Sequence, residues 1–291
     1  MNDNIFSGLE DLGLGKLDEL QLFGKKEETK EGTTEKKEES PLAHLYDQEV
    51  QCPVCGSKFK VRSVKSSSYR VLKKDSDFFI RYGTVNPYFY DVWLCNICGY
   101  ATMKSDFNKI RGFQIEKIQK NISMKWTGRT YPEVYTIDNA IERYKLALYN
   151  SVVMESKTSR KAMNCLKLAW MYRLLEDDKN EQLFLAQALS GFSEAYSSED
   201  FPIYGMDRFT TEYLIGELNR LVGNYEESNK WYGKVILSSA APQKIKDLAR
   251  DQRDLAKQAE TASEEEIGME DDLAVDEKSK KSGFFSKFFG K

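Results

Sequence analysis

Residues 52–56 read CPVCG and residues 95–99 read CNICG, so two C-x-x-C-G motifs stand 39 residues apart. A C-x-x-C turn places two thiolates on one side of a tight loop, and a glycine after the second cysteine allows the positive φ that such a turn needs. Two turns facing each other supply four sulfur atoms, the ligand set of one structural Zn²⁺ ion with no position left for water or substrate. The predicted zinc ligands are Cys52, Cys55, Cys95 and Cys98.

Three other interpretations of these cysteines stay open, and the simplest is that they are inert thiols. Two disulfides would suit an exported protein, but the chain opens with MNDNIFSGLEDLG, without a basic segment before an apolar one, so we expect no secretory signal. A C-x-x-C thiol oxidoreductase is the third alternative, which the glycine after the second cysteine does not favour. Cys165 falls within an apolar helical pattern and is expected in the core, whereas His44 is expected at the surface.

The stretch between the two motifs is typical of β-structure. Residues 58–64 (KFKVRSV) alternate basic and apolar side chains, and residues 69–73 and 78–82 are rich in β-prone types. Residues 88–94 (YFYDVWL) follow a turn at Asn86-Pro87 and lead into the second cysteine motif as a further strand. These segments predict a small zinc-ribbon-like β module with a long central insertion.

Composition and charge favour a folded chain with two modules and acidic ends. Of the 291 residues, 41% are hydrophobic and 12% aromatic, which is enough for a core. Formal net charges are −5 for residues 1–44, +5 for 45–112, zero for 113–260 and −3 for 261–291. We assign these segments to an apolar docking segment with a disordered acidic linker, the β module, a helical domain, and an acidic linker with a Phe/Lys tail. A single His and no activated-nucleophile motif argue against an enzyme.

Helical spacing dominates from residue 113 onward, where Gly and Pro are scarce. The pattern predicts a helix over 138–150 capped by Asp138, a pair over 162–175 and 181–196, a second pair over 209–222 and 225–237, and a last helix over 243–259. The whole domain would then contain about five to seven helices.

The second helix pair resembles a tetratricopeptide repeat. Gly216 would let its two helices approach closely, and Tyr232 would fill the gap between them. The spacing of the units is irregular, and some positions depart from the usual residues of the repeat, namely Asn219, Ser228 and Val235. A stack of such pairs predicts a concave face for a protein partner. Candidate exposed residues on that face are Asn164, Lys167 and Arg208.

Basic and aromatic side chains are interspersed in the β module and suggest an alternative function. They are Arg62, Lys65, Arg70, Lys73, Lys74 and Arg81, with Tyr69, Phe78, Phe79 and Tyr82. Such a set can stack on and neutralise a nucleic-acid strand. The simpler interpretation, a β-sheet with solvated charges on one face and packed rings on the other, is favoured because the net charge is small.

Residues 46–107 carry the most specific pattern of the chain. They read YDQEVQCPVCGSKFKVRSVKSSSYRVLKKDSDFFIRYGTVNPYFYDVWLCNICGYATMKSDF. In its two cysteine motifs and its DSDF…NPYFYDVWLCxxCGY stretch, this sequence is similar to the bacterial family of unknown function DUF2225, over roughly residues 45–250. The resemblance implies a bacterial, cytoplasmic-facing protein with a metal-binding N-terminal module and a helical, repeat-like C-terminal half. It implies no activity.

Both ends of the chain carry apolar side chains beyond the two modules. Residues 4–23 (NIFSGLEDLGLGKLDELQLF) precede the acidic linker and are typical of a tethered docking motif, in which the candidates are Ile5, Phe6, Leu9 and Leu12. Residues 278–291 (KSKKSGFFSKFFGK) have the composition of a short interfacial membrane helix, whose candidates are Phe284, Phe285, Phe288 and Phe289. The alternative is that each end folds back onto its own domain.

The sequence as a whole therefore predicts an α+β protein: a zinc-ribbon-like β module followed by an all-α tetratricopeptide-like domain, with disordered acidic ends. We expect a non-enzymatic zinc-binding adaptor that binds a protein partner through its helices or its N-terminal segment, and that makes weak membrane-surface contact through its tail. Because no apolar run is long enough to span a bilayer, the expected location is cytoplasmic, peripheral at the inner face of the membrane.

Overall fold

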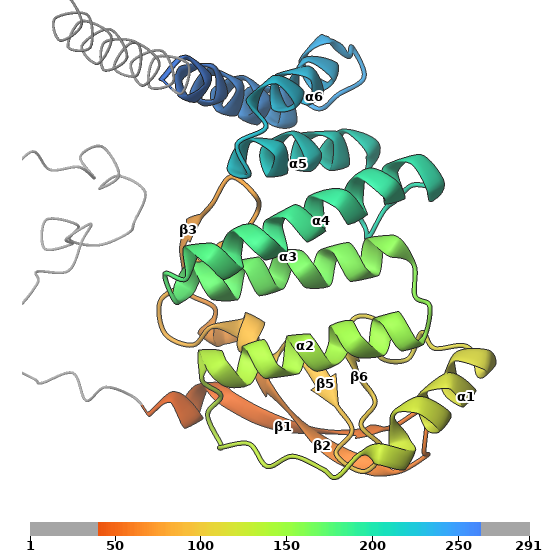
Figure 1. The fold of residues 1–291 in the computed structure, drawn as a ribbon. Helices are drawn as coiled ribbons and strands as arrows, with labels where there is room; N and C mark the ends of the chain where they lie inside the picture. Colours follow the sequence, from red (N-terminus) through yellow and green to blue (C-terminus); the bar gives the residue numbers. More distant parts are fainter. Residues whose placement is uncertain (1–39, 263–291) are drawn as a thin grey trace, which may run out of the picture. The chain divides into compact units, whose positions relative to one another are not determined.

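A computed structural model of the chain describes residues 40–262. The N-terminal candidates Ile5, Phe6, Leu9 and Leu12 and the C-terminal candidates Phe284, Phe285, Phe288 and Phe289 lie outside the described residues. Within 40–262, short β-hairpins come first and helices follow (Figure 1). The fold is mixed α+β, as predicted.

Six short strands form three antiparallel hairpins in the described part of the chain. They are β1 (Leu45–Gln51) with β2 (Lys58–Val64), β3 (Val71–Lys74) with β4 (Ile80–Tyr82), and β5 (Val92–Leu94) with β6 (Ala101–Met103). The predicted bounds of β2 are confirmed. The sequence does not predict its partner β1, because only Leu45 of that strand is buried and its side chains show no alternation of apolar and polar types.

Residues 88–94 differ from the predicted strand. A 3₁₀ helix, η4 (Pro87–Tyr90), occupies the first part, and the strand begins only at Val92. The Asn86 side chain accepts a hydrogen bond from the Tyr88 amide at 3.0 Å, and Pro87 has the fixed φ that suits a first helical position. A capped proline turn therefore overrides the β-propensity of the aromatic residues that follow.

Helices fill the rest of the described chain. They are α1 (Gly112–Asn121), α2 (Ile137–Val153), α3 (Thr158–Leu174), α4 (Asp178–Ser198), α5 (Arg208–Leu221), α6 (Tyr225–Leu237) and a helical segment over residues 243–262. A short 3₁₀ turn, η5 (Ser123–Lys125), follows α1. The predicted bounds of α6 are confirmed, and the helix count lies within the predicted range.

The start of α2 corrects one prediction. Its N-cap is Thr136, whose hydroxyl accepts a hydrogen bond from the Asn139 amide at 3.4 Å while the Asn139 side chain accepts one from the Thr136 amide at 3.0 Å. The prediction that Asp138 caps this helix is wrong. Asp138 instead lies in the first turn, where its negative charge is favourable near the helix N-terminus.

Helices α2 to α6 pack in chain order, each against the next, and α2 also lies against β5, β6 and η4 (Figure 1). One hydrophobic core consequently contains Phe79 and Val92 from the hairpins together with Tyr144, Trp170 and Leu214 from the helices. The predicted boundary between residues 112 and 113 coincides with the start of α1, but side chains from both sides of it share this core.

The α5–α6 pair shows the close approach expected at Gly216. A methyl group at this position would lie 2.9 Å from the Tyr232 ring, which is fully buried between the two helices. The local packing prediction is confirmed, while a tetratricopeptide repeat as such stays a prediction.

Buried charges attach the β3–β4 hairpin to the helices. Asp77, which is fully buried, accepts hydrogen bonds from Arg173 at 2.8 Å and from the Trp170 indole at 2.9 Å. The neighbouring Ser76 donates to Glu217 at 2.6 Å. The hairpin is therefore fixed to α3 and α5 by polar contacts as well as by the shared core.

Across residues 40–262, none of the helices combines the length and the apolar character needed to cross a bilayer.

Candidate metal centre

The two cysteine motifs form the turns of the β1–β2 and β5–β6 hairpins. In each turn the amide of the first cysteine donates to a carbonyl five residues later, Cys52 to Ser57 at 2.9 Å and Cys95 to Tyr100 at 2.8 Å. The amides of Gly56 and Gly99 donate back to those first cysteines, both at 2.9 Å, and both glycines have φ of +74°. The predicted positive φ is confirmed in both turns.

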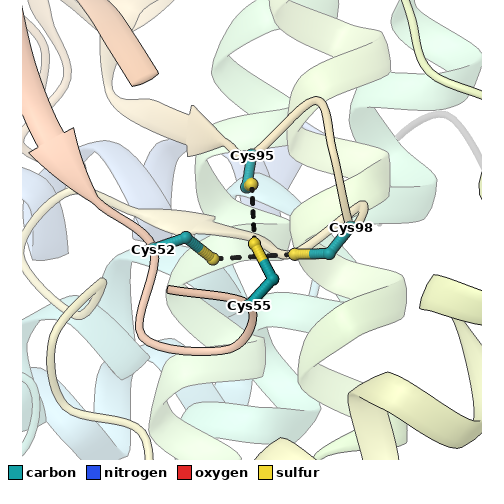
Figure 2. A group of neighbouring side chains, drawn as sticks. All are labelled: Cys52, Cys55, Cys95 and Cys98. Atoms are coloured by element: carbon teal, nitrogen blue, oxygen red, sulfur yellow. Dashed lines mark hydrogen bonds between the residues drawn. The ribbon is translucent and has the colours of Figure 1, made fainter. Parts of the chain in front are cut away.

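Figure 2 shows four sulfur atoms converging from these two turns, and all four lie within 4.8 Å of one another. Cys52 Sγ lies 3.6 Å from Cys98 Sγ, and Cys55 Sγ lies 3.7 Å from Cys95 Sγ, so each of these contacts joins one motif to the other. Zn–S bonds of about 2.3 Å in a tetrahedron would place the sulfurs about 3.8 Å apart. The donor set and its spacing fit a four-coordinate metal ion.

The electrostatics of the cluster favour a cation at its centre. Hydrogen bonds from Cys52 and Cys98 lower the pKa of Cys95, whereas contact with Cys52 and Cys95 raises the pKa of Cys98. One thiolate therefore suppresses the ionisation of its neighbours, because like charges at this distance repel. A cation would allow all four thiols to ionise, since it attracts every thiolate at once.

The cluster is closed on one side and open on the other. Cys52, Cys95 and Cys98 are buried, whereas Cys55 is exposed, as is Ile97 in the second turn. The buried side is an apolar layer formed by Val54, Tyr100, Phe107, Ile118, Ile122 and Met154. Solvent therefore reaches the site through the first motif.

Helix α1 and the turn η5 hold the two motifs together from outside. Gln119 donates to the carbonyl of Val54 in the first turn at 3.0 Å, and Ser123 donates to the carbonyl of Cys98 in the second at 2.8 Å. Sequence reasoning gives this segment no role, because it contains neither Cys nor His. The signal available was the spacing of Ile115, Ile118 and Ile122, which marks an apolar helix face.

Cys165 and His44 are the remaining cysteine and the one histidine of the chain, both of types that bind zinc, and neither belongs to this cluster. Cys165 is 7% exposed, and burial raises its pKa to about 11, so the prediction of a core position is confirmed. His44 is half-buried, and its Nδ1 lies 3.0 Å from the Ser68 hydroxyl.

The basic and aromatic residues of the β module are partly engaged within the fold. Arg62 pairs with both carboxylate oxygens of Asp47, at 2.8 and 3.0 Å, and Arg81 pairs with Asp75 at 2.8 Å. Phe79 is fully buried. These three side chains are therefore occupied by contacts inside the protein.

Two of the three residues assigned to a concave helical face do not lie at the surface. Asn164 is 2% exposed, and Lys167 forms an ion pair with the buried carboxylate of Asp91. Asn164 is buried because α3 packs between α2 and α4, whereas Lys167 is half-buried and directed to Asp91, the residue before β5. Arg208 is exposed, and it pairs with Glu212 at 2.9 Å.

Comparisons with known proteins agree with the resemblance seen in the sequence. A family model described as "Uncharacterized protein conserved in bacteria (DUF2225)" matches residues 45–256. An uncharacterized protein of Borreliella burgdorferi is 23% identical over 156 residues, which cover 47% of this chain and 56% of that protein. The chain thus spans just over half the length of this curated relative, and no solved structure matches.

Proposed function

This chain belongs to the bacterial DUF2225 family, and from that premise we propose that it is a zinc-binding adaptor rather than an enzyme. The observation that carries the proposal is the cluster of four cysteine sulfurs, all within 4.8 Å of one another. Four thiolates complete a tetrahedral coordination sphere and leave no position for water or substrate. The ion would therefore be structural, fixing the β1–β2 and β5–β6 hairpins to each other and to α1.

Zinc is the metal that this ligand set favours, because soft thiolates in a tetrahedral arrangement select Zn²⁺ or iron. The test is elemental analysis of the full-length protein, which should give about one zinc per chain. The variants Cys52→Ser and Cys98→Ser should lose the metal. The matched control Cys165→Ser, a change at a cysteine outside the cluster, should keep it. Iron in place of zinc, or full metal content in Cys98→Ser, would contradict the assignment.

The thiol oxidoreductase alternative predicts a different pairing of the sulfurs. A redox C-x-x-C motif forms its disulfide between its own two cysteines, whereas the 3.6 and 3.7 Å contacts here join different motifs. Mapping of disulfides after mild oxidation separates the two functions. A rapidly reversible Cys52–Cys55 or Cys95–Cys98 bond, with no metal present, would favour the oxidoreductase.

The pairing of the buried ionisable groups supports a non-enzymatic role. Among the described residues, Asp77 is paired with Arg173, Glu217 with Arg220 and Asp91 with Lys167. A catalytic acid or base needs to be free to exchange its proton with a substrate. The chain's one histidine, His44, ends the 3₁₀ turn Pro41–His44, just before β1, and lies outside the sulfur cluster.

The adaptor role combines the helical stack with the two terminal segments. A stack of α2 to α6 offers a broad binding surface for a protein partner, and the tail would add weak contact with a membrane at its cytoplasmic face. Sedimentation of the full chain with vesicles containing anionic lipid tests the membrane part. Deletion of residues 284–291 should abolish binding and leave the unfolding temperature unchanged. Equal binding of both proteins would remove the membrane from the proposal.

Deletion of residues 1–23 tests whether the N-terminal segment binds a protein partner. Loss of a co-purifying partner, with zinc content and unfolding temperature unchanged, is the expected outcome. A partner retained by this variant, but lost when exposed residues of α2 to α6 are changed, would assign the binding to the helices instead.

A further inference from the structure

A groove of about 620 Å³ lies between the β3–β4 hairpin and the helical segment 243–262, next to the end of α5. Four side chains of the helical segment face it: Lys244, Leu248, Gln252 and Leu255. Their spacing of four, four and three residues places them along one stripe of the helix. At 1.5 Å per residue this stripe is about 16 Å long, so the groove extends along about three helical turns.

The apolar part of the groove lining, here called the floor, consists of Phe78, Leu221, Leu248 and Leu255. Leu255 is 47% exposed although it is a large aliphatic residue. The three arginines of the lining, Arg81, Arg173 and Arg220, are already paired with Asp75 or Glu217. Phe78 has φ of +72°, a conformation that is a genuine outlier for an aromatic residue. Strain of this kind persists where the surrounding structure fixes the residue, and it is concentrated at functional sites.

The contacts around Phe78 show what fixes it. Its ring lies against that of Tyr213, with 5.3 Å between the centroids. The Tyr213 hydroxyl donates to the Ser76 carbonyl at 2.8 Å, and Ser76 donates to the fully buried Glu217 at 2.6 Å. With Asp77 bound to Arg173, the two residues before Phe78 are held by hydrogen bonds, and the residue after it, Phe79, is fully buried, so the groove is preformed.

The three lysines of the groove lining, Lys73, Lys74 and Lys244, are here called the rim, and their charge is only partly balanced, because Asp75 is shared with Arg81 and Arg173. Within 40–262, neither Lys74 nor Lys244 forms an ion pair, and the 3.9 Å pair of Lys73 with Asp75 is exposed on the lysine side. The Lys74 ammonium lies 4.5 Å from the centre of the Phe78 ring. Partial burial and the nearby charge of Lys244 lower the pKa of Lys74, so the two lysines repel each other across the groove.

We propose that this groove binds an acidic amphipathic helix of a partner protein. Apolar side chains of that helix would lie on the leucine floor, and its carboxylates would pair with Lys73, Lys74 and Lys244. An anionic partner removes the repulsion between the lysines, and three turns of helix match the length of the stripe. The inference rests on the proposed adaptor role, and it is independent of the metal.

A peptide fits this groove better than a nucleic acid does. Base stacking needs an open aromatic face, but the Phe78 ring already contacts Lys74 and Tyr213. Apart from the Phe78 ring, the floor is aliphatic and consists of Leu221, Leu248 and Leu255. Such surface suits leucine-type side chains at helical spacing.

The test is a binding titration of the full-length protein with a designed fluorescent peptide. The peptide carries leucines at positions i, i+4, i+7 and i+11 with glutamates between them. A matched control peptide has glutamine in place of every glutamate. Since the two residues have similar helix propensity, the peptides differ mainly in charge. We expect saturable binding of the glutamate peptide, and binding of the glutamine peptide weaker by about tenfold or more. Carbodiimide coupling followed by mass spectrometry should join the glutamates to Lys74 and Lys244.

Charge-reversal variants provide the matched comparison. Lys74→Glu with Lys244→Glu should abolish binding of the glutamate peptide. Lys120→Glu with Lys257→Glu, the same change of charge at two exposed lysines outside the groove, should leave it unchanged. Binding that survives the first pair of changes, or no saturable binding at all, would overturn the proposal.

Two further kinds of outcome would also overturn it. Coupling of Lys74 and Lys244 to residues 1–23 or 263–277, or to a second copy of the chain, would assign the groove to self-contact. Displacement of the peptide by oligo(dT) in a strongly salt-dependent manner would assign it to nucleic acid. Zinc content and vesicle binding, measured on the same variants, should stay unchanged. If they do, a failed peptide titration contradicts the groove proposal alone and not the proposed function.

Discussion

Gly99 lies directly against the indole of Trp126: a methyl group on Gly99 would come within 2.7 Å of Trp126 Cδ2. Gly56 occupies the equivalent position of the first cysteine turn with the same φ of +74°, and a methyl group there would meet nothing within 4 Å. The Trp126 indole also donates to the Asn96 carbonyl at 2.9 Å. The two turns thus share a backbone conformation, but Trp126 packs tightly on the second.

Alanine at these two glycines should therefore have unequal effects. Both variants force a side chain into the left-handed region, which costs about 1 kcal/mol. Gly99→Ala adds a collision with the half-buried Trp126 ring, worth about 2 kcal/mol more, whereas Gly56→Ala does not. Urea unfolding of the metal-loaded proteins measures the difference, and Gly99→Ala should also lose zinc faster to a chelator. Equal destabilisation would show that Trp126 moves aside without cost.

The cysteines should become reactive in a fixed order once the metal is removed. Cys55 should be alkylated first because it is exposed, then the three buried cysteines of the cluster, and Cys165 only on unfolding, since burial raises its pKa to about 11. Timed alkylation with mass spectrometry gives the order, and the metal-loaded protein serves as the unreactive control. Early labelling of Cys165 would contradict the burial seen here.

Removal of the Asp77 carboxylate should destabilise the fold strongly. Asp77→Asn leaves Arg173 without one of its buried partners, while Glu181 still binds the guanidinium at 2.7 Å, so we expect a loss of about 3 kcal/mol. The control Asp47→Asn breaks the half-exposed pair with Arg62 and should cost about 1 kcal/mol or less. Chemical unfolding measures both losses of stability. Similar losses would mean that the buried pair contributes no more than the half-exposed pair.

Two glycines in the helical stack should respond to alanine with opposite signs. A methyl group at Gly216 in α5 meets Tyr232 at 2.9 Å, so Gly216→Ala should destabilise by about 1–3 kcal/mol. Gly233 in α6 has nothing within 4 Å, and Gly233→Ala should stabilise by about 0.5–1 kcal/mol through helix propensity. Thermal unfolding distinguishes the signs. A stabilising Gly216→Ala would mean that α5 and α6 do not pack as closely as described.

Asp75 should make the stability of the protein depend on pH in the acid range. Burial opposes its ionisation, but the hydrogen bonds and charges of Arg81 and Arg173 together outweigh burial, so its pKa lies below the usual 3.8. A lowered carboxyl pKa adds stability that is complete above the unfolded-state value and is lost as the pH falls through the folded-state value. The stability difference between wild type and Asp75→Asn should thus shrink below about pH 4. A difference that is constant from pH 7 to pH 2 would contradict this account.

The parts of the site that the sequence predicts are local. The turn hydrogen bonds and positive φ of each C-x-x-C-G motif depend on five consecutive residues, so the motif alone specifies them. Strand β2 and helix α6 follow from alternation and helical spacing over a few residues, and their predicted bounds are confirmed. The closeness of the four sulfurs is also predictable, because two such turns are expected to bind one metal ion together.

The parts that the sequence does not predict depend on distant partners. Asp77 and Glu217 are charged residues that a sequence pattern places at the surface, but both are fully buried. Arg173 satisfies Asp77, and Ser76 satisfies Glu217 together with the nearby Arg220 and Tyr232. The Asp77–Arg173 and Ser76–Glu217 contacts join residues 96 and 141 positions apart, so no local pattern indicates them. The burial of Asn164 is of the same kind, since it results from the position of α3 within the stack.

The 39-residue segment between the cysteine motifs is anchored at both ends by the sulfur cluster and in its middle by Asp77 and Arg173. Closing a loop of this length has an entropic cost, and a loop already closed at one point costs less to close at another. Metal binding and attachment of the hairpin to the helices should therefore favour each other by the same free energy. Weakening the Asp77–Arg173 pair should therefore lower the metal affinity of a site in which neither residue is a ligand. The helical half of the protein would in this way influence how tightly the metal is bound.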